Sequence, residues 1–394
     1  MSIAPKPPAP FSQAELLRRR GDLRDAAFAA GVETVLAYGA NRFGSSIGWL
    51  TTWPVTREAV AILDRGGPAR LLVGFPNHVP QARRFLDEAV PGDETEPLDA
   101  DLTTQTMRAL ARGGPARPVG LLGPVPSALR DAVRSWATRV VALDTAYTRI
   151  RMTKSAEELA WIDYAAALTD QAGHALLEAA GQGATESEMV AAAEASYRRC
   201  GGVHHICYLS VTDMAAPDRC VPGQWPTDRR AVPGHALVFE LSAGWGPDYP
   251  GQLLRTATVG AEPSPLYARL HTVAEAVRDQ LLGLIRPGAH PADLMAVLDL
   301  VTEAGLTIVD DLVHGLCGGY LPPVLRGGRR PDGLHAEPLR PGMTLVVQPN
   351  ICTPDLTAGV QTGELVAVTQ TGWRRIHQFP AGLRQVPFSP SGVR

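Results

Sequence analysis

The sequence predicts an α/β protein of two domains, and three observations carry this prediction. First, 394 residues are more than one hydrophobic core usually supports. Second, short apolar runs alternate with helical patterns between residues 11 and 143. Third, the segment after residue 145 repeats one order of helices and strands, which indicates a duplicated domain.

The amino-terminal part is expected to be a short arm followed by a small α/β domain. Residues 1–10, MSIAPKPPAP, are rich in proline and predict a disordered arm. The helical pattern that follows is SQAELLRRRGDLRDAAFAAG, and the apolar runs that predict strands are VETVLAY, ARLLVGF and RPVGLLG. We therefore assign residues 11–145 to this domain.

The second domain is expected to begin with a long helix. Ser155 is followed three residues later by Glu158, the spacing of a capping box at a helix start. The apolar spacing after Ser155, in AEELAWIDYAAALTDQAGHALLEAAG, suits an amphipathic helix. The domain boundary is therefore predicted at residues 145–152, and the second domain covers residues 146–394.

A duplication is the simplest reading of the second domain. The helical segment that contains Gly183 resembles the one that contains Gly288, 105 positions later. The strand pattern PGHALVFELSAG, with Gly234, then recurs as PGMTLVVQPNI, with Gly342, 108 positions later. The shared order and nearly constant offset predict two copies of a helix-helix-strand unit with an internal pseudo-two-fold axis.

The two strand patterns end on polar residues, Glu240 in the first and Gln348 in the second. In a duplicated domain, equivalent strand ends face a shared cleft, so these side chains are expected to converge there. A polar group at the end of a buried strand is costly unless it finds a partner or a ligand. The alternative for either residue is a side chain that points to water.

Composition limits the partners. Charged residues make up 20% of the chain, the net charge is −3, and no run of five or six like charges is present, which argues against nucleic acid and acidic membrane surfaces. A neutral or zwitterionic small molecule is the expected ligand. No apolar run approaches the roughly 18 residues of a membrane span, and residues 1–10 lack an apolar signal core, so we expect a cytoplasmic protein. The five cysteines are widely spaced without a CxxC pair, which predicts neither a disulfide framework nor a zinc cluster.

Several motifs of the chain resemble the creatinase, prolidase and methionine aminopeptidase superfamily, over residues 145–380 for its pita-bread domain and 11–143 for its creatinase-type amino-terminal domain. These motifs are RMTKSAEELAWIDYAA, PGHALVFELSA, YPGQLLRTATVG, DDLVHGLCGGY, VVQPNI and GVQTGELVAVT. The resemblance implies a curved, mainly antiparallel sheet covered by helices. It also implies a homodimer in which the amino-terminal domain of one subunit caps the active site of its partner. Asn41, Arg42 and Trp49, in a glycine-containing loop, suit that role, although Arg42 could equally be structural.

The metal-binding positions of the resembling peptidases are altered in this chain. Those enzymes hold two divalent ions with two aspartates, a histidine and two glutamates. The corresponding positions here are Glu240, Gln252, His314, Gln348 and Gly363. Amide oxygens are weak neutral ligands, whereas two divalent ions need several anionic oxygens, so we predict no two-metal site and no cofactor, and leave open one weakly held ion. Glu364 could substitute for the glycine, but adjacent residues of a strand point to opposite faces.

Two further histidines that steady the scissile carbonyl in those peptidases are also missing. One position falls at Leu321-Pro322-Pro323 and the other near Cys220. His204 and His205 lie upstream and could project into the same cleft, or they could be structural.

Some members of this superfamily lack metals, notably creatinase and ectoine hydrolase, which cleave C–N bonds in small compounds. The chain resembles these types most. The predicted catalytic residues are Glu240, His314 and Glu364, and the predicted substrate-binding residues are Gln252, Gln348, Arg255, Tyr249, Cys220, His204, His205 and Arg42.

The roles of these residues follow from their chemistry. Glu240 would act as a general base or a nucleophile, with a pKa raised by its apolar strand, and His314 would pass the proton to the leaving nitrogen. The two glutamines would orient a polar substrate. Arg255 would anchor a substrate carboxylate or Glu240, or else form a structural ion pair. Tyr249 would donate a hydrogen bond, or else only pack.

The sequence therefore favours a metal-independent hydrolase of a C–N bond in a small polar metabolite. Three alternatives remain at this point: a lyase, isomerase or cyclase that uses the same Glu/His pair, a metal-dependent Xaa-Pro peptidase, and a binding protein without catalysis.

Overall fold

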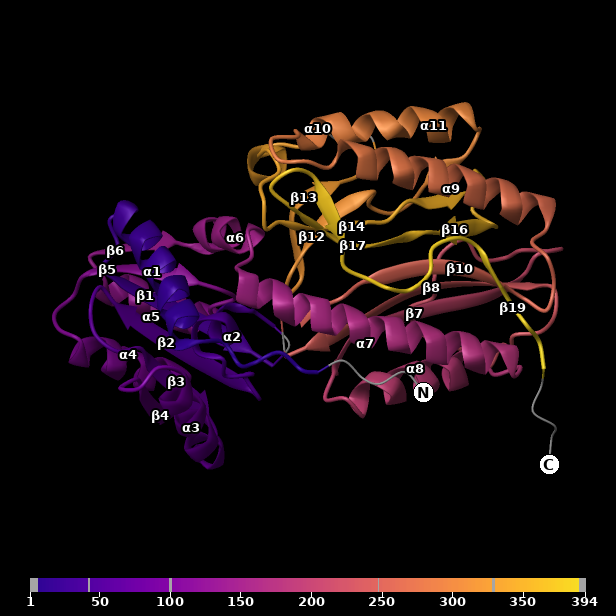
Figure 1. The fold of residues 1–394 in the computed structure, drawn as a ribbon. Helices are drawn as coiled ribbons and strands as arrows, with labels where there is room; N and C mark the ends of the chain where they lie inside the picture. Colours follow the sequence, from indigo (N-terminus) through magenta and orange to yellow (C-terminus); the bar gives the residue numbers. More distant parts are fainter. Residues whose placement is uncertain (1–5, 42, 99–100, 247, 328–329, 390–394) are drawn as a thin grey trace. The chain divides into compact units, whose positions relative to one another are not determined.

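The computed structural model describes residues 6–41, 43–98, 101–246, 248–327 and 330–389. The chain divides into two compact units. One is Ala9–Arg151, drawn in indigo to purple in Figure 1, and the other is Met152–Arg394, drawn in magenta to yellow, together with the described residues 6–8. Residues 6–10, within the predicted arm, lie in no helix or strand, and the rest of that arm falls outside the described residues. None of the described helices combines the length and the apolar character that a membrane crossing requires.

The amino-terminal unit is built around one mixed sheet, in the order β4-β3-β2-β1-β5-β6. Its strands are β1 (Thr34–Ala40), β2 (Glu58–Asp64), β3 (Arg70–Gly74), β4 (Glu94–Leu98), β5 (Pro118–Leu122) and β6 (Arg139–Ala142). Its helices are α1 (Gln13–Ala29), α2 (Ser46–Thr51), α3 (Val79–Ala89), α4 (Leu102–Arg112), α5 (Ser127–Trp136) and α6 (Asp144–Met152). Two clusters of buried apolar side chains fill the unit. The three apolar runs predicted as strands are confirmed as β1, β3 and β5.

The helices of the second unit begin where the sequence signals predict. Ser155 caps α7 (Ala156–Gly181) in a capping box with Glu158, and Thr185 caps α8 (Glu186–Arg198) in the same way with Glu188. These caps satisfy backbone N–H groups that the first helical turn leaves without partners. The remaining helices are α9 (Pro265–Leu284), α10 (Pro291–Leu294) and α11 (Leu298–Glu303).

The main sheet of this unit has the order β13-β12-β14-β17-β10-β8-β7. Its strands are β7 (Val203–Asp213), β8 (His235–Trp245), β10 (Leu253–Val259), β12 (Val313–Leu316), β13 (Tyr320–Leu325), β14 (Thr344–Val347) and β17 (Gly363–Val368). Neighbours along this path are antiparallel. The order is symmetric about the β17–β10 pair, with β7, β8 and β10 on one side and β12, β14 and β17 on the other. A duplicated three-stranded unit would give this order.

Shorter strands extend the main sheet and form a small second one. At the margins of the main sheet lie β9 (Tyr249–Pro250), β18 (Trp373–Arg375) and β19 (Arg384–Val386), and the small sheet comprises β11 (Thr307–Ile308), β15 (Asn350–Cys352) and β16 (Gly359–Gln361).

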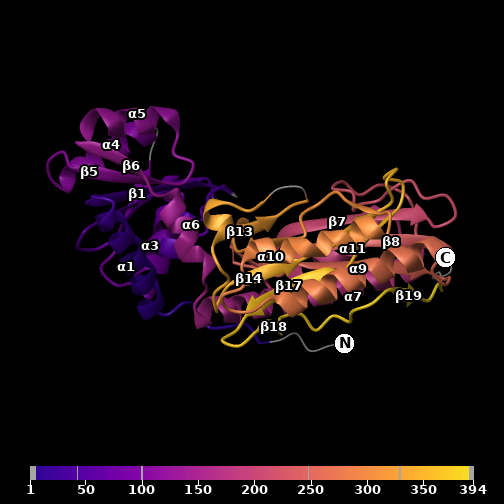
Figure 2. The same ribbon diagram turned by 90° about the horizontal axis from the view of Figure 1, so that it is seen from above.

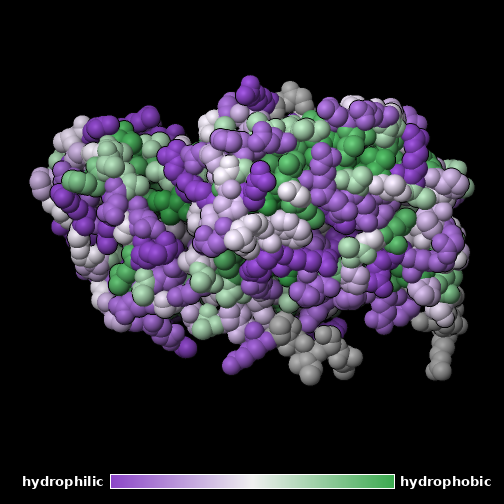
Figure 3. Space-filling model, turned by 45° about the horizontal axis from the view of Figure 1, so that its top comes forward, coloured by the Kyte–Doolittle hydropathy of each residue, from purple (hydrophilic) through white to green (hydrophobic). Residues whose placement is uncertain are grey.

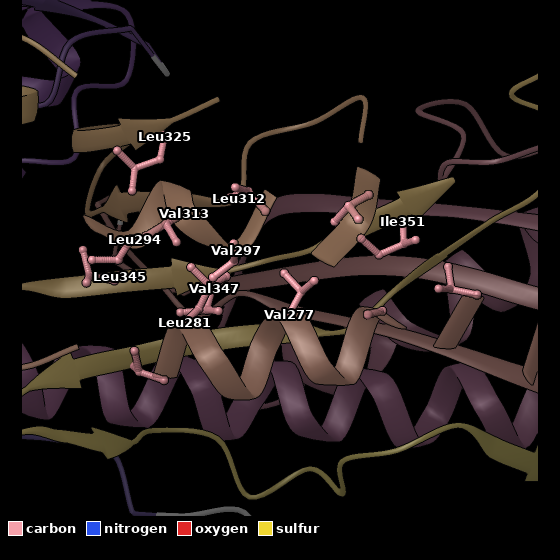
Figure 4. Packing of buried hydrophobic residues seen from close by; sticks show 14 of the residues in the cluster. Val277, Leu281, Leu294, Val297, Leu312, Val313, Leu325, Leu345, Val347 and Ile351 are labelled. Atoms are coloured by element: carbon pink, nitrogen blue, oxygen red, sulfur yellow. The ribbon is translucent and has the colours of Figure 1, made fainter. Parts of the chain in front are cut away.

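Long helices cover one face of the main sheet. In Figures 1 and 2, α7 runs along the β8 and β10 half, and α9 runs along the β14 and β17 half, with α10 and α11 beside it. Figure 4 shows Val277 and Leu281 of α9 in one apolar cluster with Val313 of β12 and Val347, the last residue of β14. Because side chains alternate along a strand, the neighbours of these valines are directed to the opposite, inner face.

The surface in Figure 3 carries hydrophilic side chains over most of this view, with smaller groups of hydrophobic residues between them. Apolar side chains scattered over a surface in this way are normal for a folded protein.

Candidate active site

Strand register places the polar residues of the first repeat on the inner face. Glu240 of β8 lies opposite Leu254 of β10, which lies opposite Gly363 of β17, so these three residues share a face. Gln252 stands two residues before Leu254 and is therefore directed to the same face. All of them are buried.

The second repeat brings two more polar side chains to this face. His314 of β12 lies opposite Val346 of β14, and Gln348 follows Val346 by two residues. His314 and Gln348 are almost completely buried, with exposed fractions of 0% and 1%. The convergence of Glu240 and Gln348 is therefore seen in the geometry.

These four side chains form one continuous chain of hydrogen-bond contacts. Nε2 of Gln252 donates to Oε1 of Glu240 at 2.6 Å and to Oε1 of Gln348 at 3.3 Å. Nε2 of His314 lies 3.2 Å from the same oxygen of Gln348, and Nδ1 of His314 lies 3.0 Å from the carbonyl oxygen of Gly315. The two glutamines thus connect the only carboxylate of this row to its only imidazole.

Glu240 is in surroundings that favour its neutral form. Burial raises the pKa of Glu240 to about 8, the charge of Asp310 adds to this effect, and the hydrogen bond from Gln252 acts against it. The pKa of His314 is lowered, mainly by burial, with the Gly315 carbonyl, Asp311 and Gln348 acting the other way. Near neutral pH both groups are therefore held towards their uncharged forms.

An aromatic ring covers His314. Tyr320 of β13 stacks on the imidazole, with ring centroids 3.8 Å apart and an interplanar angle of 16°. Burial and the charges of Asp310 and Asp311 raise the pKa of Tyr320, so its hydroxyl is a proton donor at neutral pH. A cavity of about 290 Å³ adjoins Tyr320, and its other lining residues are Val324, Arg326, Arg330, Pro331, Asp332 and His335.

His205 approaches His314 because of an irregularity in β7. The pairing of β7 with β8 shifts between His204 and Ile206, so His205 is the extra residue of a β-bulge. The pKa of His205 is lowered to about 4 by burial, and then by the nearby His204 and His314. Its Nδ1 is buried without a hydrogen-bond partner in the described part of the chain. His204 instead contacts α8, where its Nδ1 lies 3.0 Å from Glu194.

Glu364 and Arg255 do not join this row. Glu364 lies opposite Val347, on the helix-covered face, and forms ion pairs with Arg255 and Arg375. Burial acts to raise the pKa of Glu364, but the hydrogen bonds and charges of both arginines outweigh it and lower the pKa. The geometry therefore gives Glu364 and Arg255 a structural ion pair instead of the catalytic and anchoring roles expected for them.

The remaining predicted residues lie at the margin of the site or outside it. The hydroxyl of Tyr249 donates to Glu158 at the start of α7 at 2.9 Å, which ties two elements together. The carbonyl of Cys220 accepts from Sγ of Cys352 at 3.6 Å, and Asp310 raises the pKa of Cys352 in addition to burial and Cys220. Arg42 lies outside the described residues.

Sequence reasoning missed Asp310 and Tyr320. Asp310 stands in a pair of aspartates just before β12, a pattern that reads as a solvated loop, and Tyr320 follows two glycines. Both residues lie within a few positions of His314, and this closeness in sequence was the available signal that they belong to the site.

The donor set does not fit the two-metal centre of the peptidases that the sequence resembles. The row offers one carboxylate, one imidazole and two neutral amides, whereas such a centre needs several anionic oxygens. A Cβ on Gly363 would lie 2.1 Å from the carbonyl oxygen of Val347, so a side chain at this position would collide with the backbone of β14. In the described residues, no group of three or more His, Cys, Asp or Glu side chains could hold a metal ion.

Comparison with known proteins gives matches over both units. The model of metallopeptidase family M24 matches residues 160–370. The "Probable dipeptidase PepE" of Mycobacterium tuberculosis is 27% identical over 248 residues, which cover 61% of this chain and 62% of PepE. A creatinase of a Bacillus species is 24% identical over 396 residues, which cover 94% of this chain and 92% of the creatinase.

Solved structures give the same fold. The dipeptidase PepE from Mycobacterium ulcerans matches with a TM-score of 0.76 at 20% identity, over 96% of this chain and 100% of that one. The dipeptidase and creatinase matches together do not single out the creatinase type that the sequence motifs favoured. Since the family model covers more than half of the chain, this protein belongs to metallopeptidase family M24.

Proposed function

We propose that this protein hydrolyses a C–N bond of the amide, amidine or guanidino type in a small polar metabolite, with Glu240 as the acid-base group and without a two-metal centre. The observation that carries this proposal is the buried chain from Glu240 through Gln252 and Gln348 to His314. These four residues occupy positions that, by the sequence resemblance, correspond to metal ligands of the peptidases.

Glu240 is the group placed to act on the substrate. Its Oε1 is occupied by Gln252, and no hydrogen bond from the described residues occupies its Oε2. A carboxyl group with a pKa of about 8 exchanges its proton near neutral pH, which suits a general acid-base catalyst. Both ring nitrogens of His314 are occupied, Nδ1 by the carbonyl of Gly315 and Nε2 by Gln348. His314 therefore acts on Glu240 through the two glutamines.

The proposed reaction needs no other reactant than water. Glu240 as a carboxylate takes a proton from water while the water oxygen bonds to the substrate carbon. The C–N bond then breaks, its electron pair stays on nitrogen, and Glu240 returns the proton to that nitrogen. The carboxylate is regenerated, and the products are the hydroxylated carbon compound and the amine.

The test is a substrate screen of amidines, guanidines, N-acyl amino acids and Xaa-Pro dipeptides, each in metal-free buffer and with added Mn²⁺ or Co²⁺. We expect turnover of a small C–N substrate that is unaffected by chelator, is lost in Glu240→Gln, and incorporates ¹⁸O from labelled water. Turnover without ¹⁸O in the product would replace hydrolysis with an elimination or rearrangement. No turnover of any compound in the screen, with ligand binding retained, would favour a non-catalytic protein.

A dipeptidase is the second candidate, because the PepE relatives carry that name. It predicts cleavage of dipeptides that requires Mn²⁺ or Co²⁺. The altered donor set argues against it, and metal-dependent cleavage in the same screen would establish it.

A further inference from the structure

Each glutamine of the chain presents a single amide atom to both of its neighbours. The same atom of Gln252 contacts Glu240 and Gln348, and the same atom of Gln348 contacts Gln252 and His314. An amide nitrogen only donates and an amide oxygen only accepts. Each glutamine therefore donates to both neighbours or accepts from both, and a half-turn of the amide exchanges the two states.

Tyr320 is a group outside this row of four side chains that interacts with the amide of Gln348, and its hydroxyl can donate or accept, so it suits either orientation of that amide. The other atom of the Gln348 amide is buried and has no hydrogen-bond partner within the described ranges. The orientation of His314, in contrast, is fixed. Nδ1 faces the carbonyl of Gly315, which only accepts, so Nδ1 carries a hydrogen and the state of Nε2 alone varies.

Two arrangements satisfy every contact of the chain. In the first, Gln252 donates to both neighbours, so Gln348 accepts from both and Nε2 of His314 must carry a proton. In the second, Gln252 accepts from both, so Gln348 donates to both, Nε2 offers its lone pair and Oε1 of Glu240 must carry the proton. An ionised Glu240 beside a neutral His314 fits neither, because two acceptors then face each other at one contact.

We propose that Gln252 and Gln348 tie the ionisation of Glu240 to the protonation of His314, so that Glu240 becomes a carboxylate only when Nε2 of His314 carries a proton. The mismatch in a doubly deprotonated chain is a buried polar contact without a partner, and such contacts are unfavourable. The chain thus retains at least one proton between its ends.

The groups around the chain are compatible with this coupling. Glu240 faces Asp310, whose charge opposes its ionisation, and Gln252. His314 is approached by Asp311 before β12, by Tyr320 of β13 and by His205 of β7. The raised pKa of Glu240 and the lowered pKa of His314 favour the neutral arrangement at rest.

The use of this coupling in catalysis rests on the proposed function, because it keeps an imidazolium behind the carboxylate that takes the proton of water. The coupling itself belongs to the resting protein. It is therefore tested without substrate, and its failure would not be confused with failure of the proposed reaction.

The experiment follows the Glu240 carboxyl signal by NMR in the full-length protein labelled with ¹³C at the glutamate side-chain carboxyl, between pH 5 and pH 10. The signal is assigned by its loss in Glu240→Gln. Gln348→Leu removes the amide oxygen that would otherwise face the lone pair on Nε2 of His314. Gln252 can then donate to the Glu240 carboxylate without creating two facing acceptors, so the pKa of Glu240 should fall by at least one unit. Gln252→Leu removes that donor, so the pKa should rise.

Opposite signs from two neighbouring glutamines distinguish the coupling from a change in polarity, because a leucine at either position makes the site more apolar and would raise the pKa in both. His314→Leu removes the mismatched acceptor by another route and should also lower the pKa, which keeps the test open if Gln348→Leu does not fold. Gln361→Leu replaces a buried glutamine of β16 outside the chain and should leave the pKa unchanged. A pKa that is unchanged or raised in both Gln348→Leu and His314→Leu would overturn the proposal.

Discussion

Glu240 and Glu364 are two buried glutamates of one sheet in opposite surroundings. Glu364 faces the helices and is held by two arginines, which lower its pKa. Glu240 faces inwards, accepts a hydrogen bond from Gln252, and has its pKa raised to about 8 by burial and then by the charge of Asp310. Neighbouring residues of a strand point to opposite faces of the sheet. The face that a buried glutamate occupies therefore decides whether it stabilises the fold as part of an ion pair or is available for proton transfer.

The largest expected effect is on catalysis, and it falls on Glu240. Glu240→Gln keeps the size and the hydrogen bond of the side chain but cannot exchange a proton. Loss of an acid-base group typically costs about 10²- to 10⁴-fold in rate, so we expect kcat to fall by that amount on any substrate found in the screen. Thermal unfolding of the variant should remain close to that of the parent near pH 4.5, where the raised pKa of Glu240 costs little stability. Full activity in Glu240→Gln would remove the distinction between the two glutamates.

The next effect is on stability, and it falls on Glu364. Glu364→Gln leaves Arg255 buried without its counter-charge, and breaking a buried pair in this way typically costs about 3–5 kcal/mol. Urea unfolding should show this loss, while the kcat of the remaining folded protein stays within a few-fold of the parent. A variant with normal stability and a large fall in kcat would instead make Glu364 a catalytic residue.

The two glutamates should also give opposite slopes of stability with pH. Glu240 has a higher pKa folded than unfolded, so its contribution is present below about pH 4.5 and is lost as the pH rises through about 8. Glu364 has a lowered pKa, so its contribution is present above pH 4.5 and is lost as the pH falls. Each unit of pKa shift corresponds to about 1.4 kcal/mol. Urea unfolding of Glu240→Gln between pH 5 and pH 9 should show a flatter fall than the parent, and an equal fall would contradict the raised pKa.

A smaller effect on stability is expected at Gly363, which precedes Glu364 on β17 and lies on the same face of the sheet as Glu240. A methyl group there would lie 2.1 Å from the carbonyl oxygen of Val347, so Gly363→Ala must displace β14 or β17. Overpacking of this kind typically costs about 1–3 kcal/mol. Gly372→Ala, where a Cβ would meet no atom within 4 Å, is the matched control and should change little. Equal stability of both variants would show that the backbone around Gly363 has room for a side chain.

The smallest effect separates two adjacent histidines. His204→Asn removes a partly exposed contact with Glu194, worth about 0–1 kcal/mol, and a 3.4 Å contact with the hydroxyl of Tyr197, and should leave kcat unchanged. His205→Asn acts beside His314 and should alter the pH dependence of kcat. If both variants behave alike, the bulge in β7 has no bearing on the site.

Much of the fold could be predicted because its signals are local. Caps, apolar strands and the repeated strand pattern each lie within a short window, and they predicted the helix starts and the strands that carry Glu240 and Gln348. The expectation that both residues end their strands was wrong for Glu240, which lies in the middle of β8 because that strand continues to Trp245, whereas Gln348 directly follows β14. The alternation of side chains on a strand also indicated that Glu364 would point away from its neighbour's face.

The partners of individual side chains could not be predicted in the same way. Arg255 meets Glu364 across 109 positions, and Tyr249 meets Glu158 across 91, so neither ion pair nor hydrogen bond has a local signature. His205 owes its direction to a bulge, which shifts register by one residue without a distinctive sequence. Asp310 acts on Glu240 only because β8 and β12 belong to one sheet.

The most direct test of the central claim is the metal content of the purified protein. The protein should be prepared without chelator and incubated with Mn²⁺, Co²⁺, Zn²⁺ or Fe²⁺, and bound metal per chain should be measured by elemental mass spectrometry after removal of free ions. The Glu240 account predicts well under one tightly held ion per chain in every case. Two tightly held ions per chain would contradict it and would restore a two-metal peptidase.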